Sequence, residues 1–226
     1  MLSTSRKKII VLWLVLSLLA GCKQELIDTS LLTGDPCAPP CWYNIVPGAT
    51  NEEEVQAQLE RNPFVKRDSL TRTLTEQREV PLVAFYWHDN KGNVNRIYLR
   101  DRKVLRIEIR LAYDLRLGEV VEKYGPPESV YAVIGATEFY WCTIWYDYPA
   151  IGLTLESYSL IDPKEIADGT ISVSENTSII SAYYYAPTSL REMLGEVFLL
   201  SPEWVEIHMA NRQKWEGFGR IKIASW

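Results

Sequence analysis

The feature that most limits how this chain can fold is a twelve-residue apolar run, Ile9 to Ala20, whose only polar member is Ser17. Three basic residues, Arg6-Lys7-Lys8, stand directly before it. A membrane-spanning helix needs about 20 predominantly apolar residues, so this run is too short to cross a bilayer. A basic start followed by a short apolar run is the layout of an export signal. We therefore expect the folded part of the chain to begin after this segment.

The residues that close the run, Leu19-Ala20-Gly21-Cys22, resemble a bacterial lipobox. The resemblance implies that residues 1–21 are a lipoprotein signal peptide, that Leu19, Ala20 and Gly21 are recognised by the signal peptidase, and that Cys22 is lipidated. Two or more acyl chains hold a protein stably on a bilayer, so a triacylated Cys22 predicts anchoring to the cell membrane or outer membrane, outside the cytoplasm. The alternative is an ordinary secretory signal cut after Gly21.

The chain without residues 1–21 has 205 residues, enough for one sizeable domain or two small ones. It holds 21 basic and 29 acidic residues, because the removed segment carries three basic residues and no acidic ones. This negative balance argues against a nucleic-acid partner or a polybasic membrane surface. We expect residues 22–41 to form a lipidated tether that is loose from about residue 23 to 36.

Three thiols remain after lipidation. In an oxidising compartment Cys37 and Cys41 can close a small ring, because four residues of separation allow the Cα distance of about 4.4 to 6.8 Å that a disulfide needs. Their spacing is not the Cys-x-x-Cys of thioredoxin-like sites. His88 and His208, the only histidines, stand in no metal-ligand spacing, so no metal or cofactor is expected. Cys142 lies in an apolar stretch and is expected to be a buried thiol.

The first half of the chain predicts a helix followed by antiparallel strands. Thr50 with Glu53, or Asn51 with Glu54, can cap the helix, which buries Val55 and Leu59 and ends before Pro63. Turn-forming residues separate two expected strands, Val80–His88 and Val94–Arg100. The next expected strand shows the clearest alternation of apolar and charged residues. We therefore expect one of its faces to pack against the core and the other to face water. The packed face holds Leu105, Ile107, Ile109 and Leu111, and the wet face holds Arg106, Glu108 and Arg110.

The second half repeats this order. Asp114 can cap a helix through Leu117, Val120 and Tyr124 that stops at Gly125-Pro126-Pro127. The further strands are expected at Glu138 to Tyr148, Ile151 to Tyr158, Thr170 to Glu175, Ser178 to Tyr185 and Gly219 to Ala224. A third helix is expected from Ser189, with Glu192, to about Leu199.

Aligning the two helices with an offset of 65 residues matches Glu54-Val55 to Glu119-Val120 and Leu59 to Tyr124. We therefore predict an α+β fold of two helix-plus-antiparallel-sheet repeats in tandem, residues 42–113 and 114–226. The alternative is that two amphipathic helices share this short pattern by chance.

The two copies resemble the small α+β repeat of the SmpA/OmlA (BamE) lipoproteins and of the tandem-repeat β-lactamase inhibitory proteins. The first copy keeps the opening of that pattern, Pro47-Gly48-Ala49-Thr50, and the second keeps its close, Tyr124-Gly125-Pro126-Pro127. Neither copy has both ends. The stretch Pro36 to Thr50 also resembles bacterial lipoproteins without a known activity. The resemblance implies a non-catalytic interaction or envelope-assembly module.

The chain contains no Gly-x-Ser-x-Gly, phosphate loop, zinc spacing or dinucleotide fingerprint. We interpret His88 as a hairpin-edge residue and His208 as a surface position of a strand or short helix, so no catalytic residue is expected. The aromatic runs 140–146 and 182–185 must place rings on both sides of their strands, so both faces are covered or one is a contact surface. We expect a non-catalytic module that binds an envelope protein. The alternatives are a ligand- or cell-wall-binding lipoprotein and, less favoured, a hydrolase.

Overall fold

The computed structural model describes residues 27–136 and 140–224. Leu19, Ala20, Gly21 and Cys22 lie outside these residues, so the expected signal peptide and lipidation site stay predictions. No helix among the described residues is long and apolar enough to cross a membrane.

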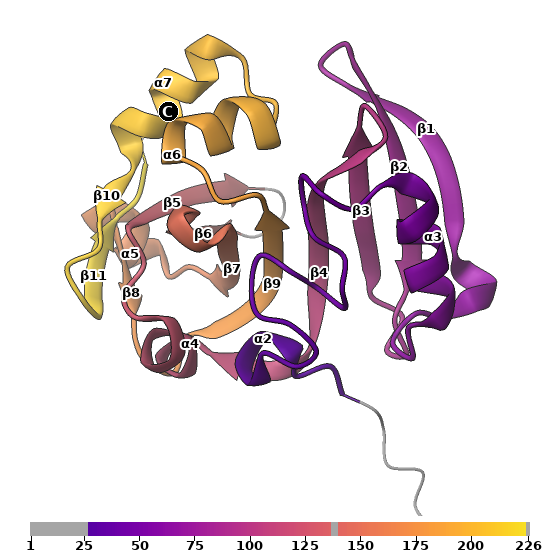
Figure 1. Cartoon of the computed structure of the whole chain (residues 1–226). Coiled ribbons are helices and arrows are strands. Elements are labelled where there is room, and N and C mark those ends of the chain that lie inside the picture. The colour runs from indigo at the N-terminus through magenta and orange to yellow at the C-terminus, as the bar shows by residue number, and fades with distance from the viewer. Residues whose placement is uncertain (1–26, 137–139, 225–226) are drawn as a thin grey trace, which may run out of the picture.

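The protein is a mixed α+β domain dominated by one nine-stranded antiparallel sheet (Figure 1). The strand order is β1-β2-β3-β4-β9-β7-β6-β5-β10, and a separate two-stranded sheet pairs β8 with β11. The strands are β1 Thr71–Gln77, β2 Val80–His88, β3 Val94–Arg100, β4 Lys103–Arg116, β5 Ser129–Ala136, β6 Tyr140–Tyr148, β7 Leu153–Leu160, β8 Thr170–Val173, β9 Ser178–Tyr185, β10 Gln213–Lys214 and β11 Gly219–Lys222.

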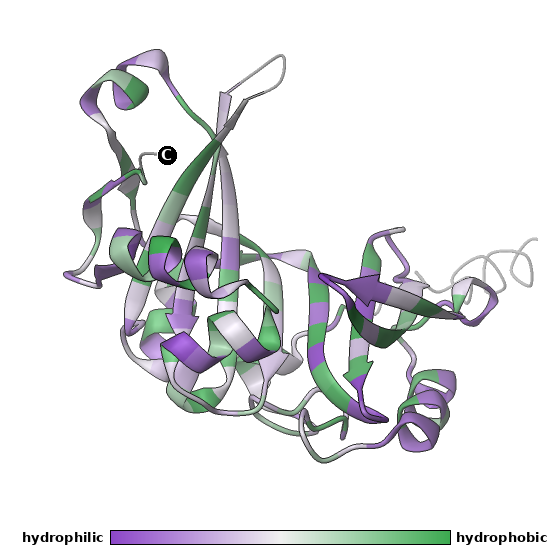
Figure 2. Cartoon of the chain, turned by 90° about the horizontal axis from the view of Figure 1, so that it is seen from above, coloured by the Kyte–Doolittle hydropathy of each residue, from purple (hydrophilic) through white to green (hydrophobic). Residues whose placement is uncertain are grey.

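The helices lie on both faces of this sheet. They are α2 Ser30–Thr33, α3 Glu52–Arg61, α4 Leu117–Tyr124, α5 Pro163–Asp168, α6 Leu190–Glu192, the π-helical turn η3 Met193–Val197 and α7 Pro202–Asn211, with 3-10 turns η1 Arg67–Ser69 and η2 Pro149–Ile151. We call the face packed against α3 and α4 the inner face, and the face under α6, η3 and α7 the outer face. The strands carry alternating hydrophobic and hydrophilic bands, as two faces of different polarity require (Figure 2).

The main core fills the inner face. Val55 and Leu59 of α3 are fully buried, as predicted, in one cluster with Ile97, Ile107 and Ile109. The second of the two expected caps forms: the Glu54 amide donates to Asn51 Oδ1 at 3.0 Å, and the Asn51 amide donates to Glu54 Oε2 at 2.9 Å. The helix start therefore satisfies two amides that would otherwise lack a partner.

The start of α4 differs from the prediction. Strand β4 runs on to Arg116 and the helix begins at Leu117, so Asp114 lies within the strand and does not cap the helix. Its carboxylate instead pairs with Arg116 and accepts the Ser178 hydroxyl at 3.1 Å. The predicted core residues Leu117 and Val120 are fully buried.

The expectation that Arg106, Glu108 and Arg110 face water is wrong for Arg106, and Glu108 is also largely covered, with 17% of its side chain exposed. Arg106 is only 4% exposed. The facing itself is as predicted, because Arg106 and Glu108 point away from buried Ile107 and Ile109. A bulge shifts the register between Tyr98–Arg106 and Leu99–Val104, so Val104 takes a buried position and Leu105 is only half-buried. The outer face is covered there by residues far along the chain.

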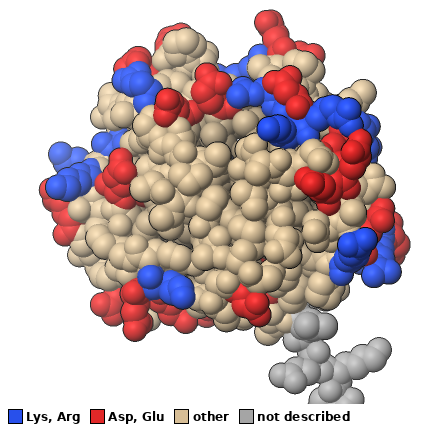
Figure 3. Space-filling model, viewed as in Figure 1, with Lys and Arg blue, Asp and Glu red and all other residues tan. Residues whose placement is uncertain are grey.

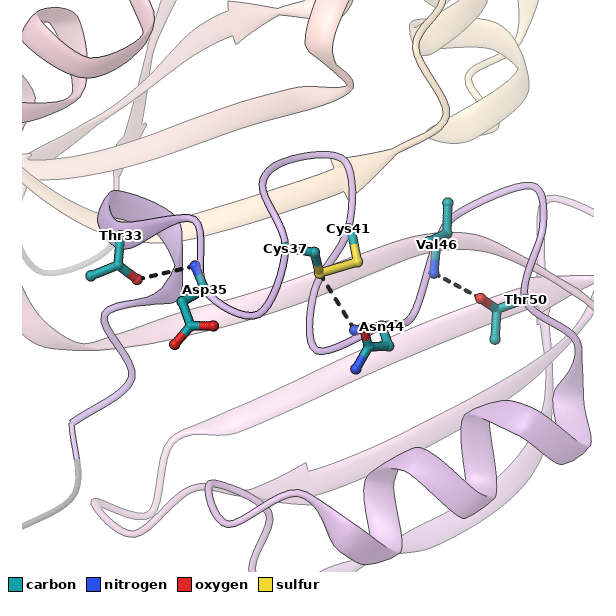
Figure 4. Close-up of a disulfide and its surroundings, with 7 residues drawn as sticks. All are labelled: Thr33, Asp35, Cys37, Cys41, Asn44, Val46 and Thr50. Atoms are coloured by element: carbon teal, nitrogen blue, oxygen red, sulfur yellow. Dashed lines mark hydrogen bonds between the residues drawn. A yellow bond between two sulfur atoms is a disulfide. The ribbon is translucent and has the colours of Figure 1, made fainter.

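The segment expected to be a loose tether is packed from Asp28 onward. Leu31 of α2 is 2% exposed, and Asp28 accepts hydrogen bonds of 3.1 Å from Trp42 Nε1 and from the Tyr43 hydroxyl. The loop from α2 to α3 crosses the strands and carries a disulfide between Cys37 and Cys41 (Figure 4). This loop has no charged residue from Pro36 to Ala49. Charged side chains lie around the rim of the view in Figure 3 and leave its centre uncharged.

Candidate binding groove on the outer face

Two adjoining cavities form a groove on the outer face, which we call the outer groove. One, of about 290 Å³, lies under the C-terminal helices and is lined by Arg96, Glu108, Trp145, Thr154, Tyr183, Leu194, Phe198, Leu200, His208 and Arg212. The other, of about 300 Å³, is lined by Asn93, Val94, Arg96, Glu108, Ile109, Arg110, Ser181 and Tyr183. Arg96, Glu108 and Tyr183 line both, so the two cavities are neighbours on the sheet.

The sheet register explains why these side chains meet. Residues directly opposite each other in an antiparallel sheet share a face, with Cβ atoms about 4.5–5.5 Å apart. One row crosses from β3 to β5 through Arg96, Glu108, Tyr183, Thr154, Asp147 and Ser129. The next row crosses from β4 to β5 through Arg110, Ser181, Glu156, Trp145 and Tyr131. Polar and aromatic side chains from distant parts of the chain therefore form one continuous floor.

The β4 end of the floor is held by Arg106. Its guanidinium donates to Glu108 Oε1 at 2.8 Å, to the Val197 carbonyl at 2.8 Å and to Gln77 Oε1 at 2.9 Å. It also lies 4.2 Å from the centre of the Tyr98 ring, within cation–π range. Glu108 meets Arg96 on its other side at 3.4 Å. Arg106 thus ties the sheet to the turn η3 that roofs the groove.

A second network of polar side chains lies in the middle of the floor. The Tyr183 hydroxyl donates to Glu156 Oε2 at 2.5 Å, and Arg110 lies 4.0 Å from the same oxygen. Arg110 also donates to the Ser181 hydroxyl at 2.8 Å. Burial and the neighbouring Glu156 raise the pKa of Tyr183, so its hydroxyl keeps its proton. Half of the Arg110 side chain is exposed, which leaves this cation facing the groove.

The far end is closed by a fully buried ion pair. Arg212 Nε donates to Asp147 Oδ2 at 2.9 Å, and both side chains are nearly inaccessible to water. Asp147 also accepts the Ser129 hydroxyl at 2.8 Å and the Thr154 hydroxyl at 3.2 Å. Such a pair is tolerated in the interior because its remaining lone pairs are hydrogen-bonded. It fixes the end of α7 to strands β5, β6 and β7.

The roof is built from α6, η3 and α7. The predicted cap is present at the start of α6, where the Glu192 amide donates to Ser189 Oγ at 3.3 Å. Phe198, just after η3, lies edge-on to Tyr183 with 5.8 Å between the ring centres. The helix expected from Ser189 to about Leu199 ends at Val197, and its second part, η3, is π-helical. The roof thus covers one end of the aromatic floor and leaves Trp145 and Tyr183 half-buried.

His208 lies on the helix α7, where its side chain is half-buried and lines the outer groove. Its ring centre is 4.9 Å from that of Tyr131 in the floor, and Arg212 lies beside it at 3.3 Å. Burial, helped by the charge of Arg212, lowers the pKa of His208 to about 4. The imidazole is therefore neutral at pH 7.

The other predicted site residues lie outside the groove. The Cys37–Cys41 disulfide is in the α2–α3 loop, and Cys142 faces the inner core, where burial raises its thiol pKa to about 12. His88 ends β2, and its backbone amide donates to the Ser69 hydroxyl at 2.8 Å. Within residues 27–136 and 140–224, no three His, Cys, Asp or Glu side chains gather as a metal site would require.

Sequence reasoning anticipated the aromatic strands 140–146 and 182–185 but not the groove. One of the two expected arrangements has both faces of these strands covered, and the other leaves one face as a contact surface. Here α6, η3 and α7 cover part of the outer face, and the core covers the inner one. Comparison with models of known protein families, with curated proteins and with solved structures finds no match. The function is therefore inferred from the residues of the groove.

Proposed function

We propose that this chain is a lipid-anchored, extracytoplasmic protein of the bacterial envelope that acts as a non-catalytic protein-interaction or envelope-assembly module. The outer groove binds its partner. The observation that carries the proposal is the groove floor, where half-buried aromatic rings lie beside two half-exposed arginines, Arg96 and Arg110. Aromatic residues and arginine are enriched where proteins bind one another.

The carboxylates of the groove support binding over catalysis. Glu108 lies between Arg106 and Arg96, Glu156 accepts from Tyr183, and Asp147 is paired with Arg212. A general acid or base must reach a proton of the substrate. Oxygens of all three carboxylates are already engaged by cations or hydroxyls of the protein, so these groups suit a fixed recognition surface.

The anchor and the groove lie at opposite ends in this proposal. Cys22 precedes Asp28 by six residues, which span at most about 20 Å, so a lipid on Cys22 holds the domain close to the bilayer. Helix α2, near the start of the described chain, lies at the end of the molecule opposite α6 and α7 (Figure 1). The roof of the groove is then turned away from the membrane and toward a partner.

We also propose that the sheet arose from two tandem units, as the resemblance to the SmpA/OmlA (BamE) lipoproteins implies. Helix α3 precedes β1 to β4, and helix α4 precedes β5, β6, β7 and β9. The order β1-β2-β3-β4-β9-β7-β6-β5 sets the last strand of each unit at the centre. This mirrored order supports two units joined edge to edge. The family resemblance, in turn, supports an interaction role.

Photo-cross-linking in intact cells tests the proposal. A photoreactive amino acid replaces Arg110 in the groove or, as the matched control, Glu60 on the exposed side of α3. We expect a covalent adduct with a second polypeptide from position 110 only, and its loss when Trp145→Ala is added. Equal adducts from both positions, or none from position 110, would contradict the proposal.

A small-molecule role is the second candidate, favoured by the half-buried Trp145 indole that faces the 290 Å³ cavity. Cell-wall glycans offer apolar sugar faces that pack on such a ring. A ligand that binds the native state raises the melting temperature of the protein. Stabilisation by cell-wall fragments that Trp145→Ala abolishes, without any protein adduct, would favour this candidate.

A further inference from the structure

The strand β1 forms one edge of the large sheet and pairs, among the described residues, with β2 alone. It has seven residues, and in Figure 1 it is the outermost ribbon on the side away from α7. Its first four residues are exposed, and Leu74 is 73% exposed. The opposite edge is β10, which has only two residues. An edge strand of this length presents unpaired amide and carbonyl groups that can pair with another strand.

The sequence of β1, Thr-Arg-Thr-Leu-Thr-Glu-Gln, is complementary to itself when two copies run antiparallel. A two-fold axis through Leu74 sets Leu74 opposite Leu74 of a second copy, Arg72 opposite Glu76, and Thr73 opposite Thr75. Opposite charges facing each other across strands are stabilising, whereas like charges are destabilising. A shift of two residues would instead set Leu74 opposite Arg72 or Glu76, so the charges select one register.

The facing of these residues fits the same arrangement. Arg72, Leu74 and Glu76 lie opposite Phe85, Val83 and Pro81 of β2, on the inner face. Phe85 belongs to the core and Val83 packs against it, so Leu74 continues this apolar layer to the edge of the sheet. Two opposed Leu74 side chains would cover each other's exposed surface. Protective edge charges usually repel a second strand, but here they would attract one.

We propose that two copies of this chain associate through antiparallel pairing of their β1 strands, which joins the two sheets into one continuous sheet. The interface is isologous, since the same strand serves both copies. Gln77, the last residue of β1, lies beside the roof, where it accepts from Arg106 and donates to the Phe198 carbonyl at 3.2 Å. The proposed pairing therefore relies on the exposed residues Thr71 to Leu74 and on Glu76.

Disulfide trapping of the full chain in its membrane tests the register. Leu74→Cys places two thiols on directly opposed residues, whose Cα separation of about 4.5–5.5 Å suits a disulfide. We expect mild oxidation to give a covalent dimer. Leu160→Cys is the matched control, because Leu160 is 68% exposed on the β7 strand and has no such counterpart in the proposed dimer. Equal dimer yields from the two variants, or from the unmodified chain, would overturn the proposal.

Charge-reversal variants distinguish specific pairing of the two β1 strands from disulfide formation by random collision. In the Leu74→Cys background, Arg72→Glu or Glu76→Arg alone should lower the dimerisation constant on the order of ten-fold, since two cross-strand pairs become like-charged. The double reversal should restore it. Arg72 also pairs with Glu52 of its own chain at 2.6 Å, so melting curves must show that each variant still folds. Failure of the double reversal to restore trapping would contradict the strand pairing.

Discussion

Arg106→Ala should destabilise the protein far more than a charged residue on a sheet surface normally would. Arg106 is 4% exposed, and its side chain donates three hydrogen bonds, to Glu108, the Val197 carbonyl and Gln77. Truncation leaves Glu108, which is only 17% exposed, with Arg96 at 3.4 Å as its remaining cation. It also removes the main link between β4 and the turn η3.

The magnitude follows from the loss of one partner of a buried pair. Such losses cost about 3–5 kcal/mol, because the remaining charge stays buried without its counterion. We therefore expect a loss of about 3–5 kcal/mol for Arg106→Ala, similar to the roughly 2–5 kcal/mol expected for Ile107→Ala in the core. Arg110→Ala, two residues along the same face but half exposed, should cost about 1 kcal/mol or less.

Urea unfolding followed by tryptophan fluorescence measures these differences as shifts of the midpoint. Replacing both partners, Arg106→Met with Glu108→Leu, should recover much of the loss, since no unpaired charge is then buried. If Arg106→Ala costs no more than Arg110→Ala, the burial of Arg106 under η3 is wrong, and the roof of the groove is wrong with it.

Three further predictions concern single groups. Burial raises the pKa of Cys142 to about 12, so alkylation at pH 8 should modify this thiol only after unfolding; an adduct on the native protein would contradict its burial. Burial and Arg212 lower the pKa of His208 to about 4 against roughly 6.5 when unfolded. The stability that neutral His208 contributes should be complete above about pH 6.5 and be lost as the pH falls toward 4. The unfolding midpoint of His208→Gln should therefore vary less with pH across that range than the midpoint of the unaltered protein. Unchanged pH dependence would refute this. Asn51→Ala should cost about 1 kcal/mol through loss of the α3 cap, and a thermal melt indistinguishable from the unaltered chain would argue against the capping box.

Both ends of β2 and of β3 could be predicted, because runs of residues that favour strands flank a turn-forming segment. Strand β1 could not, since Leu74 is its only hydrophobic residue and it lies at an exposed edge. Strand β5 was missed because its Ser-Val-Tyr-Ala-Val-Ile run alternates poorly and is buried on both faces. The residues around His208 in α7 could be assigned only to a strand or a short helix, since only Val205 within α7 is buried and no apolar stripe marks it.

The groove could not be predicted from local sequence patterns for a different reason. Arg106 is buried by contacts with residues about 90 positions further along the chain, and Asp147 is paired with Arg212 across 65 positions. Alternation along β4 reports which side a residue faces, but not what covers that side. The sequence features that could have indicated the outer face are the aromatic strands and the alternating arginines and glutamate of β4.

Hydroxyl-radical footprinting in intact cells, compared with the purified protein, tests the central claim most directly. Trp145 and Tyr183 face the outer groove, whereas Phe218, which is 38% exposed, lies outside the groove lining and serves as the internal reference. A partner bound in the groove should protect Trp145 and Tyr183 from oxidation in cells and leave Phe218 unchanged. Equal oxidation of all three residues in the two samples would contradict a binding role for the groove.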